Sequence, residues 1–308
     1  MTKTVFIDGG AGTTGLEIAD RLAGRPDLSI LTLPDDRRKD ASARAEAIND
    51  ADFVILCLPD DAAREAVSLI ANDRTRVVDA STAHRTAPGW VYGFAELEPD
   101  QAERIAQARF VSNPGCYPTG FLALVRPLVR AGIVPADWPL SVNAASGYSG
   151  GGKAMIAEYE TATNRAFRPY GLSLAHKHAP EMQRHSGLTH APIFAPAVVD
   201  TYRGMVVEVP LPLYALPGAP SLEAVAEVLA GAYADGRVVT FAPGEVAAVN
   251  IEENAGTDRM TLRLCGNAAT GQARLIATLD NLGKGAGGAA VQNLNIMAGL
   301  DPTAGLVL

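Results

Sequence analysis

The stretch Thr4-Val5-Phe6-Ile7-Asp8-Gly9-Gly10-Ala11-Gly12-Thr13-Thr14-Gly15 decides the fold of the first part of the chain. Residues 4–8 form a short apolar run typical of a strand, and residues 14–23 are typical of a helix. The glycines between them have the spacing Gly10-x-Gly12-x-x-Gly15. This spacing allows a tight turn at a helix N-terminus, whose free N–H groups attract pyrophosphate. A plain glycine turn would also fit, but the position favours a dinucleotide-binding turn. Its expected contacts are Gly10, Gly12, Thr13, Thr14 and Gly15.

Strands and helices alternate through the first third of the chain. Further strands are expected at residues 28–33, 52–58, 76–80 and 109–112, with helices at 43–49, 60–72 and 100–107. The run 52–58 is continuously apolar, as in a strand covered on both faces of a parallel sheet. The pattern therefore predicts an α/β fold, with a Rossmann-like doubly wound parallel sheet.

The pattern changes after Asn113. A helix is expected at 118–131, kinked at Pro127, and another at 221–234. Strands are expected at 193–199, 205–213, 238–241, 259–264 and 272–279. We predict an α+β domain over residues 116–284, which the resemblance given below makes the catalytic and dimerisation domain. The first domain would comprise residues 1–115 together with a returning segment, 285–308, that contains a last helix.

Composition excludes several classes of protein. The chain has 308 residues and a formal net charge of −8, which makes binding to nucleic acid or to an anionic membrane a poor fit. Its 3 cysteines lack Cys-x-x-Cys spacing, so a disulfide framework or structural zinc cluster is not expected. The N-terminus does not resemble a signal peptide, and no apolar run is long enough to span a bilayer. We expect a soluble, cytoplasmic protein.

The preference for NAD or NADP should depend on the loop Pro34-Asp35-Asp36-Arg37-Arg38-Lys39. A carboxylate there would bind the ribose diol of NAD, whereas Arg37 and Arg38 would hold the 2′-phosphate of NADP. Both signals are present. Three adjacent cations favour NADP(H) as the cofactor.

Asn113-Pro114-Gly115-Cys116-Tyr117-Pro118-Thr119 carries the strongest chemical signal. Cys116 follows a strand and a Pro-Gly turn and stands just ahead of a helix, whose N–H groups would lower the pKa of its thiol. The same groups could stabilise an oxyanion on a carbonyl attacked by sulfur. Cys57 and Cys265 lie in strand-like runs and fit a structural role.

A thiolate nucleophile needs a proton acceptor and donor. The segment His176-Lys177-His178-Ala179-Pro180-Glu181 offers two imidazoles and a carboxylate that could orient one of them. The spacing His-x-His also suits a metal site, although no third ligand is evident. The residues alone do not decide which imidazole is the base.

Taken together, these motifs resemble the shorter form of the N-acetyl-gamma-glutamyl-phosphate reductase family, which belongs to the semialdehyde dehydrogenases. The likeness covers essentially the whole chain. Residues 113–119 resemble the family's nucleophile motif and 176–181 its His-x-His-x-Pro-Glu. Three further segments also match: 81–85 a substrate segment, 146–152 a loop beside the nicotinamide, and 284–293 the C-terminal helix. His84 departs from the longer form, which usually has an aromatic residue there.

The resemblance implies NADPH-dependent reduction of an acyl phosphate to a semialdehyde in arginine biosynthesis, through a thioester on Cys116. It places His178 in the base role, with His176 and Glu181 in support. It also implies cofactor contacts from Ser149, Gly150 and Asn293, and substrate contacts from Ser81, Arg85 and Asn113. No metal is implied.

Two alternatives remain open at this point. Aspartate-semialdehyde dehydrogenase uses the same chemistry on a shorter acyl phosphate, but its nucleophile motif is Asn-Cys. A non-catalytic dinucleotide-binding sensor could keep the fold, although Cys116 together with the histidine segment argues against it. The expected partners are a small-molecule substrate and, because the second domain is rich in strands, further copies of the chain as a homo-oligomer.

Overall fold

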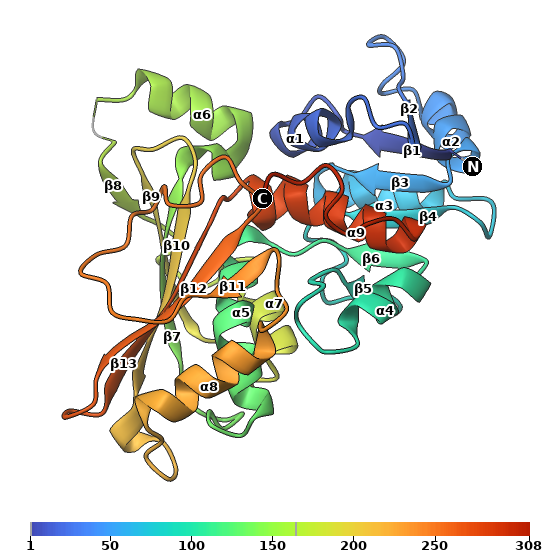
Figure 1. Ribbon diagram of the computed structural model, residues 1–308. Coiled ribbons are helices and arrows are strands. Elements are labelled where there is room, and N and C mark those ends of the chain that lie inside the picture. The colour runs from blue at the N-terminus through green and yellow to red at the C-terminus, as the bar shows by residue number, and fades with distance from the viewer. Residues whose placement is uncertain (1, 164) are drawn as a thin grey trace. The chain divides into compact units, whose positions relative to one another are not determined.

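A computed structural model describes residues 2–163 and 165–308 (Figure 1). The chain forms two compact units. The first comprises Met1–Gly115 with Ala286–Leu306, and the second Cys116–Gly285 with Val307–Leu308. Within the described ranges, none of the helices has the length and apolar character needed to cross a membrane.

The first unit contains a six-stranded parallel sheet with the order β2-β1-β3-β4-β6-β5. Its strands are short: β1 (Lys3–Asp8), β2 (Leu28–Leu31), β3 (Phe53–Leu56), β4 (Arg76–Asp79), β5 (Val91–Tyr92) and β6 (Phe110–Ser112). The chain order reverses between β1 and β3, which neighbour each other in the sheet. Ligands of such sheets bind at that reversal, beyond the carboxyl ends of the strands.

Helices cover both faces of this sheet (Figure 1). On one face, α1 (Thr13–Leu22), α4 (Gln101–Gln107) and α9 (Gly288–Ala298) bury side chains such as Ile18, Ile105 and Leu294. On the other face, α2 (Ala41–Asp50) and α3 (Asp60–Ser68) bury Ile48 and Ala63. The continuously apolar β3 is buried along its whole length, because both faces are covered.

The second unit contains a mixed seven-stranded sheet with the order β11-β12-β13-β10-β7-β9-β8. Its strands are β7 (Ser141–Gly147), β8 (Phe167–Pro169), β9 (Ile193–Val199), β10 (Met205–Pro212), β11 (Val239–Phe241), β12 (Met260–Asn267) and β13 (Gln272–Leu279). Burial alternates along β10, which indicates one covered and one open face. The unit's helices are α5 (Cys116–Arg130), α6 (Gly152–Thr161), α7 (Ala179–Ser186) and α8 (Leu222–Ala232).

Helix α5 packs against β10, β13, α7 and α8 and contains Pro127. Proline has no N–H, so the carbonyl of Ala123 loses its normal helical donor. The Tyr233 hydroxyl, at the C-terminal end of α8, donates to that carbonyl at 2.8 Å. A side chain therefore satisfies the acceptor that Pro127 leaves, and α5 continues to Arg130.

The fold class predicted from the sequence is confirmed, and the predicted elements differ mainly at their ends. Helix α5 begins at Cys116, not at residue 118, because Pro118 lies in the first turn, where helical N–H groups need no intrahelical acceptor. Cys265 lies within β12 and does not end it, and Cys57 follows β3. The last helix begins at Gly288, after a π-helical turn, Gly283–Gly287. Five elements of the structure were not predicted from the sequence: β5, β7, β8, α6 and α7.

Candidate active site

The glycine-rich turn joins β1 to α1 in the first unit. Gly12 is the N-cap of α1, so Thr13 and Thr14 occupy the first turn, where N–H groups have no acceptor within the helix. A Cβ on Gly15 would lie 2.6 Å from both the Gly10 Cα and the Gly9 carbonyl oxygen. Only glycine permits this contact, which keeps the start of α1 close to the end of β1. These are the features of a pyrophosphate-binding turn.

A groove of about 550 Å³ lies at this end of the first unit's sheet. It is lined by the glycine turn, the end of β2, Cys57 to Pro59 and three cations, Arg38, Lys39 and Arg44. The groove lies where the strand order reverses, and its residues suit a dinucleotide: glycines for the backbone approach and cations for phosphate. Arg37 is not among its lining residues.

Two carboxylates near this groove, those of Asp8 and Asp35, are paired with arginines. Asp8 is the one carboxylate among the described lining residues, and it accepts from Arg44 Nε and Nη2 at 3.1 and 2.9 Å. Burial raises the pKa of Asp8, and the bonds from Arg44 oppose that rise. Asp35 lies outside the groove on the exposed loop, with Oδ1 2.6 Å from Arg38 Nη2. Asp8 is thus held by Arg44 inside the groove, whereas the pair of Asp35 and Arg38 is exposed to solvent.

The segment after β4 is organised by Asp79, which is fully buried. Its carboxylate accepts from the Ser81 N–H at 2.9 Å and from the Ser81 hydroxyl at 2.7 Å. His84 Nδ1 lies 2.6 Å from Asp79 Oδ2, and its ring stacks on Trp90 with centroids 4.1 Å apart. His84 therefore takes part in the network that shapes this segment.

Arg85 and Asn113 meet at the carboxyl ends of β4 and β6. Arg85 Nε donates to the Asn113 carbonyl at 3.0 Å, and Arg85 Nη2 donates to the Ala80 carbonyl at 3.2 Å. The Arg85 side chain is buried. The structure thus brings Ser81, Arg85 and Asn113 into one neighbourhood of the first unit.

Asn293, on α9, reaches the same neighbourhood. Its Nδ2 donates to the Gly93 carbonyl at 2.8 Å and to Asn113 Oδ1 at 3.0 Å. Asn113 Nδ2 in turn donates to the Ala286 carbonyl at 3.0 Å. The Asn293 Oδ1 atom is buried and has no hydrogen-bond partner among the described residues, so it could accept a hydrogen bond from a bound group.

Cys116 is the first residue of α5 in the second unit and is half-buried. The N–H groups of the first helical turn have no acceptor within the helix. Cys57 differs, because desolvation, with added repulsion from Asp79 and Asp8, raises the pKa of its thiol to about 12. Cys57 is therefore a neutral thiol near pH 7 and a poor nucleophile. All three cysteines are free.

Two tyrosines accompany Cys116. The Tyr170 hydroxyl donates to the Tyr117 hydroxyl at 3.3 Å, and Tyr117 donates to the Ala197 carbonyl at 3.1 Å. Burial, with a smaller contribution from the charge of Cys116, raises the pKa of Tyr170 to about 12. Burial also raises the pKa of Tyr117 well above its usual value. Both phenols therefore remain protonated and can act as hydrogen-bond donors. Tyr170 was not predicted as a site residue, because no motif in its local sequence distinguishes it from other tyrosines.

The two histidines lie against Tyr117. Its ring centroid is 6.3 Å from that of His176 and 5.9 Å from that of His178, and the two imidazoles are 4.7 Å apart. His178 is buried at the N-cap of α7, and Glu181 is buried in that helix's first turn. His176 Nδ1 accepts the His178 backbone N–H at 3.1 Å. Burial, assisted by Lys177 and opposed by Glu181, lowers the pKa of His176.

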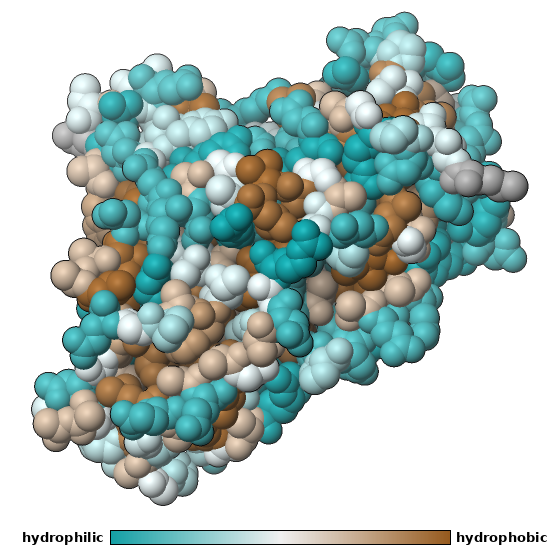
Figure 2. Space-filling view, viewed as in Figure 1, coloured by the Kyte–Doolittle hydropathy of each residue, from teal (hydrophilic) through white to brown (hydrophobic). Residues whose placement is uncertain are grey.

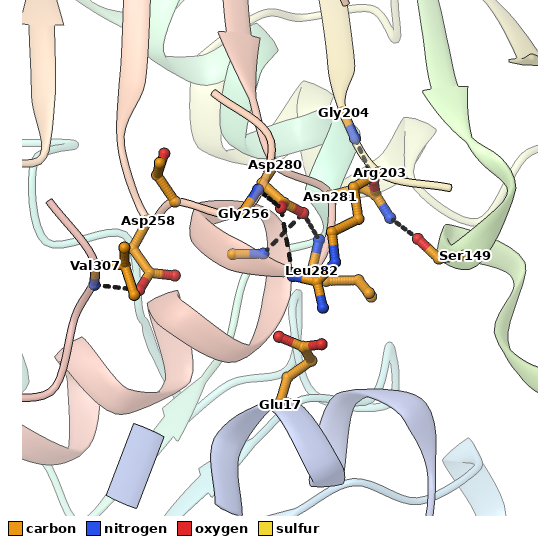
Figure 3. Close-up of polar contacts among 12 residues, drawn as sticks. Glu17, Ser149, Arg203, Gly204, Gly256, Asp258, Asp280, Asn281, Leu282 and Val307 are labelled. Atoms are coloured by element: carbon orange, nitrogen blue, oxygen red, sulfur yellow. Dashed lines mark hydrogen bonds and ion pairs between the residues drawn. The ribbon is translucent and has the colours of Figure 1, made fainter. Parts of the chain in front are cut away.

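The Ser149–Gly150 turn lies in a 3-10 helix, Tyr148–Gly151, of the same unit. Ser149 is buried, and its hydroxyl accepts from Asn281 Nδ2 at 2.8 Å (Figure 3). Asn281 Oδ1 also accepts the Gly204 N–H at 3.0 Å. Asn281, which follows the end of β13, therefore links the Ser149 turn to the backbone of Gly204.

The predicted site residues divide between the two units. The first unit holds Gly10, Gly12, Thr13, Thr14, Gly15, Arg37, Arg38, Ser81, Arg85, Asn113 and Asn293, and the second holds Cys116, Ser149, Gly150, His176, His178 and Glu181. Within residues 2–163 and 165–308, no group of three or more His, Cys, Asp or Glu side chains is arranged to hold a metal ion.

Comparison with known proteins gives the family. Residues 4–105 match the semialdehyde dehydrogenase NAD binding domain, and residues 116–281 match the semialdehyde dehydrogenase dimerisation domain. The chain is 53% identical to N-acetyl-gamma-glutamyl-phosphate reductase 2 of Pseudomonas putida, covering 97% of both chains. It is 53% identical to N-acetyl-gamma-glutamyl-phosphate reductase of Brucella anthropi, covering 97% of this chain and 99% of that one. The chain belongs to the N-acetyl-gamma-glutamyl-phosphate reductase family.

Solved structures show how widely the fold of this reductase family is shared. An aspartate semialdehyde dehydrogenase II of Vibrio cholerae matches with a TM-score of 0.71 at 14% identity, covering 97% of this chain and 98% of that one. An aspartate semialdehyde dehydrogenase with NADP from Candida albicans matches with a TM-score of 0.65 at 14% identity, covering 97% and 99%. Aspartate-semialdehyde dehydrogenases are thus distant relatives in fold, whereas the reductases are close relatives in sequence.

Proposed function

We propose that this chain catalyses the NADPH-dependent reduction of N-acetyl-L-glutamyl 5-phosphate to N-acetyl-L-glutamate 5-semialdehyde and phosphate, a step of arginine biosynthesis. The observation that carries the proposal is Cys116 at the start of α5, in the same unit as two adjacent imidazoles, of which His178 is buried and His176 half-buried. The high identity to reductases of that name supplies the substrate.

The first step is acyl transfer to Cys116. The thiolate attacks the acyl carbon and a C–S bond forms. The bond between the acyl carbon and the bridging phosphate oxygen then breaks, and phosphate leaves. N–H groups in the first turn of α5 stabilise the negative oxygen of the tetrahedral intermediate. The product is a thioester on Cys116.

The second step releases the aldehyde. NADPH, when bound, would supply the hydride for the thioester carbon. Protonated His178 gives a proton to the oxygen as negative charge develops. The neutral imidazole then acts as the base and takes the proton back as the C–S bond breaks. The sulfur leaves as a thiolate, so Cys116 is ready for another turnover.

His176 and Glu181 support this exchange. The Nδ1 atom of His176 is occupied as an acceptor, and burial keeps the ring neutral near pH 7. Its Nε2 then carries the hydrogen and is a donor. Glu181 opposes the lowering of the His176 pKa, which is consistent with an orienting role.

Arg85, Ser81 and Asn113 form the proposed phosphate end of the substrate site. A guanidinium matches the geometry of a phosphate, and Arg85 is held in place by two backbone carbonyls. The hydrogen bonds of Ser81 to Asp79 fix the adjacent turn. We assign Arg85 to the acyl phosphate and to the released phosphate.

The cofactor proposal is NADP(H). The glycine turn of Gly10, Gly12 and Gly15, with Thr13 and Thr14, would hold the pyrophosphate, and Arg38 with Lys39 would hold the 2′-phosphate. The support is a groove lined by these cations in which the carboxylate of Asp8 is paired with Arg44. Ser149, Gly150 and Asn293 are kept as contacts on the resemblance, and Arg37 has less support because it does not line the groove.

Assembly and location complete the proposal. The open face of the second unit's sheet presents Ile193 and Ala195 of β9, beside a pocket of about 500 Å³ with apolar rim residues including Phe167 and Leu172. Figure 2 shows hydrophobic side chains among polar ones on the surface of this unit. We propose that a second copy of the chain covers this face. Three free cysteines are typical of the cytoplasm, which is the proposed location.

Mass spectrometry of the intact protein after mixing with N-acetyl-glutamyl 5-phosphate, without NADPH, tests the function. We expect one acyl adduct on Cys116, absent from Cys116→Ser and discharged as semialdehyde when NADPH is added. Cys57→Ser is the matched control, and it should acylate normally because the Cys57 thiol is protonated.

Two outcomes would point to the alternatives. Preferential acylation by aspartyl phosphate would indicate aspartate-semialdehyde dehydrogenase activity. NADPH binding without acylation by either acyl phosphate would indicate a non-catalytic sensor.

A further inference from the structure

The turn that follows β13, residues 280–285, lies against Cys116 in the second unit. A Cβ added to Gly285 would be 2.9 Å from the Cys116 Cβ and 3.4 Å from its Cα. The Gly285 backbone is therefore in direct contact with the residue that begins α5. The Gly285 N–H donates to the Asp280 carbonyl at 2.9 Å, so the turn closes with its last residue against Cys116.

Asp280 holds this turn in one conformation. Its carboxylate is fully buried, and Oδ1 accepts the N–H groups of Leu282 and Gly283 at 2.7 and 3.2 Å. Oδ2 accepts the Gly256 N–H at 2.6 Å and lies 3.5 Å from Arg203 Nη1 (Figure 3). A buried carboxylate is stable only with such partners, so four groups fix its position and, with it, the path of the turn.

A second loop braces the same turn. A Cβ on Gly283 would lie 2.1 Å from the Thr257 carbonyl oxygen, so the two backbones are in close contact. Asp258, the next residue in that loop, accepts the Val307 N–H at 2.9 Å, as Figure 3 shows. The turn is therefore held from two sides and cannot shift without breaking these contacts.

We propose that Asp280 is a positioning residue for the Cys116 sulfur. By fixing the turn, Asp280 keeps the Gly285 backbone in contact with Cys116 and so limits where the sulfur can lie. This inference rests on the proposed function, in which that sulfur attacks an acyl carbon. Attack needs the reacting atoms roughly 3–3.5 Å apart and aligned, and a displacement of about 1 Å can cost on the order of 10²-fold in rate.

The test uses Gly285→Ala, Asp280→Asn and a matched control, Gly231→Ala on α8, where an added Cβ meets no atom within 4 Å. Two rates are measured for Cys116 in each folded variant by peptide mass spectrometry. One is acylation by N-acetyl-glutamyl 5-phosphate without NADPH, and the other is alkylation by iodoacetamide, which needs no aligned substrate.

In Gly285→Ala and Asp280→Asn we expect acylation to slow by roughly 10- to 100-fold while alkylation changes by less than about 2-fold. Gly231→Ala should match the wild type in both rates. A role limited to overall stability would instead lower acylation only in proportion to the unfolded fraction, which circular dichroism measures, and unfolding would expose the thiol to iodoacetamide.

Acylation of both variants at the rate of the Gly231→Ala control would overturn the proposal, and so would a parallel loss of acylation and alkylation. If Gly285→Ala does not fold, Asp280→Asn decides by the same pair of rates, since it keeps the side chain's size. If the wild type itself reacts with iodoacetamide but takes no acyl group, the proposed function has failed, which is a different result from a failure of positioning alone.

Discussion

His176 and His178 have different environments, although only one residue separates them. His176 accepts a backbone N–H at Nδ1, and burial lowers its pKa. His178 caps α7 and lies nearer the ring of Tyr117. The sequence placed both imidazoles in one motif but could not assign their roles, because the assignment depends on hydrogen bonds that only the folded segment makes. These bonds favour His176 as the orienting group and His178 as the base.

The loop of cations after β2 makes a prediction about cofactor choice. In the double variant Arg38→Ala/Lys39→Ala, NADPH affinity should fall by roughly 10- to 100-fold, since a hydrogen bond to a charged group contributes about 1.5–3 kcal/mol. NADH affinity should change little, because NADH lacks the 2′-phosphate. Fluorescence titration with both cofactors measures the difference.

Arg64→Ala is the control for this titration, because Arg64 is exposed on α3 and outside the groove. An equal loss of NADH and NADPH affinity would contradict a 2′-phosphate contact. If Arg37→Ala alone reproduced the NADPH-specific loss, the contact would belong to Arg37.

At the scale of elements, the sequence predicted those with strong hydrophobic patterns and missed those without. Strand β7, Ser141–Gly147, is built from small and polar residues, so it lacks the alternation that marks most strands. Its pairing with β9 and β10 compensates for that weak pattern. Helix α7 has end signals, Pro180 in its first turn and Gly187 after its end, but its 8 residues are too few to show a clear helical periodicity.

The contact between α5 and α8 makes a prediction about stability. In Tyr233→Phe, the Ala123 carbonyl loses the hydroxyl that replaces the missing Pro127 donor. Leaving a buried acceptor without a partner costs about 1–3 kcal/mol, so the free energy of unfolding should fall by that amount. Urea unfolding followed by circular dichroism measures it.

Tyr214→Phe serves as the control in the same unit, because the Tyr214 side chain is 63% exposed and should contribute little. A Tyr233→Phe variant as stable as this control would show that the Ala123 carbonyl finds another donor. The double variant Pro127→Ala/Tyr233→Phe should regain part of the lost stability, because alanine restores the helical N–H.

At the scale of the whole molecule, the strand content of the second domain predicted self-association but could not show which surface is used. Alternate residues of β9 and β10 point to opposite faces of the sheet. Which of the two faces is exposed is known only once the helices are seen to cover the other one. The other face carries Ile193, 60% exposed, and Phe167, 64% exposed. Exposed apolar side chains grouped on a sheet are typical of an interface.

Ile193→Lys tests this surface. In a two-fold interface the same residue is buried in both copies, so each dimer would bury two uncompensated ammonium groups. Half of the usual penalty for burying one unpaired charge, which is several kcal/mol, corresponds to roughly a 10- to 100-fold weaker dimer. Sedimentation velocity would show this weakening as a shift to monomer at micromolar concentration. Val246→Lys, beside α8 and 43% exposed, is the control and should sediment as the wild type. If Ile193→Lys kept the wild-type association while Val246→Lys lost it, the surface beside α8 would be the one that pairs.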